Sequence, residues 1–95
     1  MRVRWTRPAL NDLEGIGDYV AKGNPVAAAR LVARIFDHVD ALSEHPKMGR
    51  IGRVSGTREF VVSDTPFVVP YRIRGDEVEV LAVFHAARRW PKTFD

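Results

Sequence analysis

His85 is the residue best suited to proton transfer, because a histidine gives up or takes up a proton near neutral pH. Arg88, Arg89 and Trp90 follow it closely in the sequence. Arginines beside such a histidine could stabilise the charge of a phosphate while the imidazole moves a proton. The three histidines of the chain have no metal-ligand spacing, so we expect neither a metal site nor a cofactor.

Basic residues form two clusters that contain no acidic residue. The clusters are Lys47, Arg50, Arg53 and Arg58, and then Arg88, Arg89 and Lys92. Although the net charge is only +3, this clustering favours a surface for a polyanion, either a nucleic acid or an acidic protein. Ordinary solvated arginines are the alternative reading. Trp90 could stack on a base or fix the C-terminal tail to the sheet.

The composition sets the class of protein. A length of 95 residues predicts a single domain over residues 1–95. The absence of cysteine excludes disulfide bonds, a thiolate nucleophile and a cysteine-based zinc site. No apolar run has the length of a signal peptide or a membrane span, so we expect a cytoplasmic protein with no membrane partner.

Hydrophobic periodicity predicts an α+β fold with the element order β-α-α-β-β-β and a short C-terminal tail. Thr6 and Asn24 are the expected N-caps of two helices that form an αα-hairpin and end before His45. We expect the hairpin to cover one face of an antiparallel sheet. Strands are predicted over residues 3–5, 57–62, 67–74 and 78–84, with a loop over residues 46–56.

The last two strands carry the most specific signals. Gly75 and Asp76 predict a two-residue hairpin turn, because glycine adopts positive φ without strain. Pro70 lacks an N–H group, which predicts an edge position or a bulge. Leu81 and Val83 make the last strand apolar on both faces, so either the chain itself or a partner must cover both faces.

Six pieces of the chain, in this order, resemble the RelE/ParE superfamily of toxins from bacterial type II toxin–antitoxin modules. The resemblance covers almost the whole chain. The pieces are Trp-Thr-Arg-Pro-Ala-Leu-Asn-Asp-Leu, the αα-hairpin, Leu-Ser-Glu-His-Pro-Lys-Met-Gly-Arg, Gly-Thr-Arg-Glu, Val-Val-Pro-Tyr-Arg-Ile, and Val-Glu-Val-Leu-Ala-Val-Phe-His-Ala-Ala-Arg-Arg-Trp.

The resemblance implies a toxin that arrests growth and a cognate antitoxin, similar to ParD or RelB, that neutralises it. RelE-type members cut ribosome-bound mRNA without a metal, whereas ParE-type members poison DNA gyrase. Residues 67–70 lack the arginine that RelE-type members commonly place there, so we favour a ParE-like gyrase poison. A RelE-like mRNA endonuclease is the alternative, and a non-toxic binding module on the same scaffold is a further one.

The resemblance also implies roles for particular residues. For a ribonuclease, the catalytic residues are His85, Arg58 and Arg88. The antitoxin of this family wraps the helices and sheet, so we expect it to cover Leu81 and Val83. The residues implied to bind the target are Arg50, Arg53, Arg58, Arg88, Arg89 and Trp90.

Overall fold

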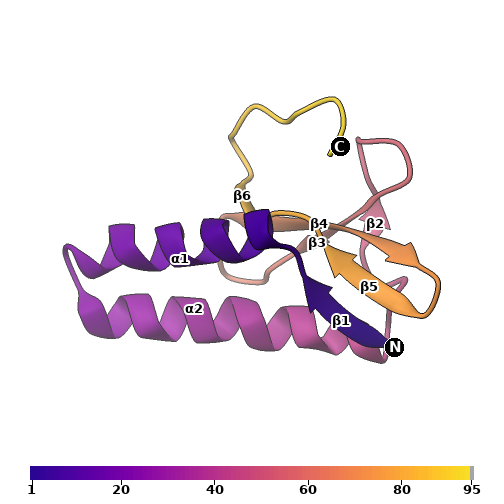
Figure 1. Cartoon of the computed structure of the whole chain (residues 1–95). Coiled ribbons are helices and arrows are strands. Elements are labelled where there is room, and N and C mark those ends of the chain that lie inside the picture. The colour runs from indigo at the N-terminus through magenta and orange to yellow at the C-terminus, as the bar shows by residue number, and fades with distance from the viewer. Residues whose placement is uncertain (95) are drawn as a thin grey trace.

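Two helices lie side by side as an antiparallel hairpin at one side of the sheet (Figure 1). The computed structural model describes residues 1–94. In it α1 (Arg7–Ala21) and α2 (Pro25–Asp40) are separated by a short turn, and the 3₁₀ helix η1 (Ala41–Ser43) extends α2. Both predicted caps are confirmed. Thr6 Oγ1 accepts from the N–H of Ala9 at 3.3 Å, and Asn24 Oδ1 accepts from the N–H of Ala27 at 3.0 Å.

Six strands form one sheet in the order β1-β5-β4-β3-β2, and β6 pairs with β4 beyond the end of β5. β4 is therefore the central strand. Only the β1–β5 pair is parallel, so the sheet is antiparallel apart from that edge. The strands are β1 (Arg2–Trp5), β2 (Arg50–Ile51), β3 (Arg58–Val61), β4 (Phe67–Arg74), β5 (Glu77–Val80) and β6 (Phe84–His85).

The strands differ from the predicted ones at two places. The predicted loop over residues 46–56 contains the short edge strand β2, which pairs with β3. The predicted strand over residues 78–84 is interrupted, because residues 81–83 leave the ladder between β5 and β6. The Gly75–Asp76 turn is confirmed, with Gly75 at φ 63°.

Pro70 explains the interruption. It lies fully buried in β4, so an edge position is wrong for it. Its carbonyl accepts from the N–H of Leu81 at 3.0 Å, and the N–H that proline lacks would point to the same side of the strand. That side is where residues 81–83 depart from regular pairing, so the ladder is interrupted opposite Pro70, where the sequence predicted a bulge as the alternative to an edge position.

The two faces of the sheet have opposite character. Alternate residues of the strands point toward the helices and form the core together with Leu13, Ile35 and Val39. Trp5 also stacks on Phe36 of α2, with ring centroids 5.6 Å apart, which ties the edge strand β1 to the helical layer. The other face of the sheet carries mostly charged side chains. No helix within residues 1–94 is long and apolar enough to cross a membrane.

Tyr71 ties the core to the loop that precedes β2. Its ring is fully buried, its hydroxyl donates to the carbonyl of Pro46 at 2.7 Å, and the same hydroxyl accepts from the N–H of Gly49 at 2.9 Å. Gly49 has no room for a side chain, since a Cβ there would lie 2.6 Å from the Tyr71 ring and 2.9 Å from a backbone oxygen. The loop is therefore fitted around a core residue.

We expect Gly49→Ala to lower the free energy of unfolding by about 2 kcal/mol, because the new methyl group must displace Tyr71 or the backbone of β3. Gly15→Ala is the matched control, because a Cβ at position 15 of α1 meets nothing within 4 Å. This control should be neutral or stabilising by up to about 1 kcal/mol. Urea unfolding measures both, and an equal response of the two variants would contradict the role of the Tyr71 contact.

Candidate functional site

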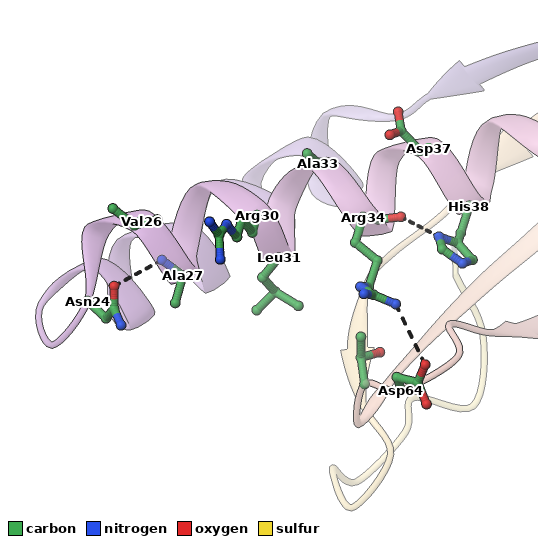
Figure 2. A pocket seen from close by; sticks show the side chains of 11 residues that line it. Asn24, Val26, Ala27, Arg30, Leu31, Ala33, Arg34, Asp37, His38 and Asp64 are labelled. Carbon is green, nitrogen blue, oxygen red and sulfur yellow. Dashed lines mark hydrogen bonds and ion pairs between the residues drawn. The ribbon is translucent and has the colours of Figure 1, made fainter.

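A groove of about 800 Å³ runs along α2 and the β3–β4 turn (Figure 2). In this groove Arg34 lies 3.8 Å from the carboxylate of Asp64, and His38 Nδ1 lies 2.8 Å from the backbone oxygen of Arg34. The residues that line the groove include none of the site residues predicted from the sequence.

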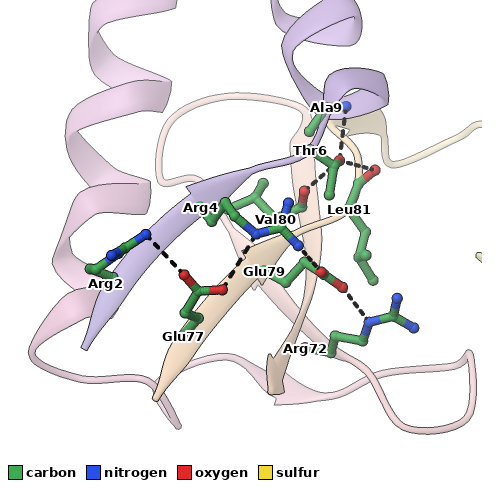
Figure 3. A network of polar contacts seen from close by, with 9 residues as sticks. All are labelled: Arg2, Arg4, Thr6, Ala9, Arg72, Glu77, Glu79, Val80 and Leu81. Atoms are coloured by element: carbon green, nitrogen blue, oxygen red, sulfur yellow. Dashed lines mark hydrogen bonds and ion pairs between the residues drawn. The ribbon is translucent and has the colours of Figure 1, made fainter. Parts of the chain in front are cut away.

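The face of the sheet opposite the helices, here called the charged face, is built from rows of arginine and glutamate. Because neighbouring strands pair in register, Glu79 on β5 lies between Arg4 on β1 and Arg72 on β4. The next row is the same, with Glu77 between Arg2 and Arg74. Figure 3 shows that side chains of the two rows are joined in one chain of contacts.

Glu79 is the buried centre of this network. Only 4% of the residue is exposed, and its carboxylate contacts both Arg4 and Arg72, with Arg72 Nε 2.5 Å from Oε1. The hydrogen bond from Arg72 lowers the pKa of Glu79, and the charges of Arg72, Arg4 and Arg74 add to this effect against the opposing effect of burial. Glu79 is therefore a charged residue at neutral pH and fixes two guanidinium groups on the surface.

Glu59 forms a second buried centre next to the edge strand β2. Its exposed fraction is 2%, and it accepts from the side chain of Arg50 at 3.1 Å and from the Nε and backbone N–H of Arg53 at 3.0 and 2.8 Å. Burial favours a raised pKa for Glu59, but these hydrogen bonds outweigh burial and lower the pKa below its ordinary value. Arg50 and Arg53, both predicted to bind the target, thus have a structural partner within the chain.

The C-terminal tail is fixed to this region by aromatic contacts. Trp90 packs edge-on against Phe84, with centroids 5.1 Å apart, and the guanidinium of Arg53 lies 3.8 Å from the centroid of the Trp90 ring. Arg88 lies over the other ring, 4.0 Å from the Phe84 centroid. Of the two readings of Trp90, the structure supports the one in which it fixes the tail to the sheet.

His85 and Arg58 lie at different parts of the sheet. His85 is exposed on β6, paired with Phe67 and 5.9 Å from its ring, and Ala87 N–H donates to its Nδ1 at 3.1 Å. Arg58 pairs with Tyr71, four residues further along β4, which is about 13 Å in the strand direction. Its guanidinium donates to the backbone oxygen of Gly49 at 2.7 Å.

The three candidate catalytic residues therefore do not converge. His85 and Arg58 are separated along β4, and Arg88 lies over Phe84, which points to the other face of the sheet from His85. Arg89 is exposed in the tail. Within residues 1–94, no group of three or more histidine, aspartate or glutamate side chains could hold a metal ion.

Leu81 and Val83 are covered by the chain itself. Their exposed fractions are 6% and 4%, and the N–H of Val83 donates to Asp12 of α1 at 3.0 Å. Of the two predicted ways to cover an apolar strand, this chain uses its own residues, so neither side chain requires an antitoxin to cover it. The apolarity of this segment gives no separate evidence for an antitoxin contact.

Clustering along the sequence did not reveal four arginines of the charged face, which are Arg2, Arg4, Arg72 and Arg74. Their signal is an alternation of period two: arginine at positions 2 and 4, glutamate at 77 and 79, and arginine at 72 and 74. Only the pairing of β1, β5 and β4 brings the three alternations into rows.

An αα-hairpin on a mainly antiparallel sheet, with a charged face opposite the helices, defines a small α+β protein. A family model described as the ParE toxin of the type II toxin–antitoxin system parDE matches residues 3–90. The chain belongs to this family, within the RelE/ParE superfamily of toxins.

Individual relatives agree with this family. The toxin homologue Y4kP of Sinorhizobium fredii is 54% identical over 91 residues, covering 96% of this chain and 94% of the relative. Toxin RelE2 of Caulobacter vibrioides is 38% identical over 87 residues, covering 92% and 97%. The structure is similar to a chain of the chromosomal ParDE system of P. aeruginosa, with a TM-score of 0.81, 33% identity, and coverage of 90% and 95%.

The buried Glu59 gives a pH-dependent prediction. We expect Glu59→Gln to lower the free energy of unfolding by about 2 kcal/mol at neutral pH, because Arg50 and Arg53 lose a charged partner but stay partly in water. The folded pKa of Glu59 lies below its ordinary value of 4.5, so its charge stabilises the wild type above that pH. This advantage over the variant should shrink as the pH falls below 4.5 and through the folded pKa.

Urea unfolding of both proteins at a series of pH values measures the effect. Glu14→Gln is the control, since Glu14 is an exposed residue of α1 and should show little difference at any pH. If the difference in unfolding free energy between wild type and Glu59→Gln did not change with pH, the stabilising role of the Glu59 charge would be contradicted.

Proposed function

We propose that this toxin arrests bacterial growth by poisoning DNA gyrase rather than by cutting mRNA, and that a cognate antitoxin of the ParD/RelB class neutralises it. The site of action is then the cytoplasm. The observation that carries the proposal is the separation of His85, Arg58 and Arg88.

Cleavage of RNA by its own 2′-hydroxyl needs a base at that hydroxyl and a cation at the same phosphate. The backbone N–H of Arg88 donates to the carbonyl of His85 at 2.9 Å, but the Arg88 guanidinium is directed to the Phe84 ring and not to the imidazole. Arg58 is held by the backbone of the loop before β2, and Arg88 is held over Phe84. A RelE-like endonuclease would have to bring Arg58 and His85 together from about 13 Å along β4, and to turn the Arg88 side chain away from Phe84.

The comparisons support the same branch. The matching family model is that of the ParE toxin, and the structural relative belongs to a ParDE system. One relative is named toxin RelE2, so the test must measure mRNA cleavage as well as growth arrest.

Surface for the antitoxin is available beside α1. A groove of about 430 Å³ lies between this helix and β6, and is lined mainly by apolar side chains, including Ile16, Tyr19 and Phe67. Tyr19 is 75% exposed, and Val83 contributes to the floor of the groove. An apolar segment of the antitoxin could bury Tyr19 there. We therefore still propose that Val83, which lines the groove, contacts the antitoxin, and we no longer propose this for Leu81.

We expect His85→Ala to arrest growth as strongly as the wild type when expressed without antitoxin, because gyrase poisoning would need no proton transfer by the imidazole. His38→Ala is the matched control on α2. Purified wild-type toxin should also leave a cell-free translation reaction programmed with ready-made mRNA undisturbed, since gyrase has no part in that reaction.

New RNA 5′ ends at ribosome-bound codons, absent with His85→Ala, would establish the RelE-like endonuclease instead. Expression of the wild type without any growth defect would favour the non-toxic binding module. Growth arrest together with intact translation is the result that the proposal expects.

A further inference from the structure

Positive charge is concentrated on one side of this protein. The side chains of the charged face include three glutamates and six arginines. These arginines are Arg2, Arg4, Arg50, Arg53, Arg72 and Arg74. The tail beside this face adds Arg88, Arg89 and Lys92. The rest of the chain has nine acidic and six basic residues. The net charge of +3 therefore combines a basic face and tail with an acidic remainder.

Five arginines of the charged face, namely Arg2, Arg4, Arg50, Arg53 and Arg72, contact a carboxylate of that face before any ligand arrives. Each buried or half-buried carboxylate contacts two of them: Glu77 contacts Arg2 and Arg4, and Glu79 contacts Arg4 and Arg72. The side chain of Arg2 is still 81% exposed and that of Arg4 is 46% exposed. One carboxylate between two guanidinium groups leaves an excess of one positive charge in each row.

We infer that the charged face binds the phosphate backbone of duplex DNA. Guanidinium groups bind phosphate oxygens through paired N–H donors, and arginines that are already ordered lose less conformational freedom when they do so. The inference rests on the proposed function, because duplex DNA is the substrate held by gyrase. It adds that the toxin contacts the DNA itself.

The surface chemistry favours DNA over a protein partner. Where β1, β5 and β4 pair, the residues facing this side are arginine and glutamate, whereas the centre of a protein–protein interface is depleted of charge and rich in apolar anchors. Interfaces with DNA are much more positively charged.

The aromatic residues favour a duplex over single-stranded RNA. Proteins that bind single strands stack unpaired bases on free aromatic rings. Here Phe84 is buried, and its ring is engaged with Trp90, Phe94 and Arg88. Trp90 is covered in turn by Arg53. A backbone-only contact needs no free ring, so the charged face suits the regular phosphates of a duplex.

The test compares two charge-matched double variants. Arg2→Gln with Arg74→Gln removes both ends of one row, and both residues are exposed. Lys22→Gln with Arg30→Gln removes the same charge from two exposed residues of the helical hairpin, one at the end of α1 and one in α2. The turn between these helices lies at the end of the hairpin away from the sheet (Figure 1). Binding of purified toxin to a fluorescent DNA duplex is followed by anisotropy over a series of salt concentrations.

We expect the Arg2/Arg74 variant to bind about tenfold more weakly, with a salt dependence shallower by about two units in the plot of log K against log salt. The Lys22/Arg30 variant should bind as the wild type does. Equal losses in both variants, no duplex binding by the wild type, or tighter binding to single-stranded RNA of the same length would overturn the inference. The inference would also be overturned if the Arg2/Arg74 variant bound DNA as well as the wild type does but bound DNA-free gyrase more weakly.

The two proposals fail separately. A toxin that arrests growth with intact translation but does not bind the duplex contradicts the DNA contact and leaves the gyrase target standing. A toxin that binds the duplex through Arg2 and Arg74 but cuts mRNA contradicts the gyrase target alone.

Discussion

Two buried carboxylates, Glu59 and Glu79, organise the side of this toxin that the helices leave open. A charged group with only a few per cent exposure is stable only when its partners satisfy it, and each of these has two arginines. The arginines are therefore fixed by the fold. Because the guanidinium of Arg53 also lies over the Trp90 ring, the same contacts help to fix the position of the tail.

This constraint shapes what the fold can do. Arginines that already contact carboxylates, backbone oxygens or aromatic rings are not free to move to a substrate. They are well suited to present a fixed pattern of charge. The separation of His85 from Arg58 and Arg88 points the same way, since acid–base chemistry on a phosphate needs its groups within hydrogen-bond reach of one substrate. Our proposal is accordingly recognition rather than cleavage.

The sequence predicted much of the fold because its local signals agree with one another. Caps at Thr6 and Asn24, the turn at Gly75 and the apolar stripes of the helices all act over a few residues. It did not predict the break at residues 81–83, which arises from Pro70 on a neighbouring strand, or β2, which is too short to show a period. The rows of the charged face join residues more than 70 positions apart, so no local pattern could reveal them.

The most direct measurement of the central claim is the supercoiling of relaxed plasmid by purified gyrase and ATP, with and without this toxin freed of its antitoxin. If recognition of gyrase is the function, the toxin blocks supercoiling in proportion to its concentration, and the His85→Ala protein does so equally well. Full supercoiling in the presence of excess toxin that still arrests cells would contradict the account.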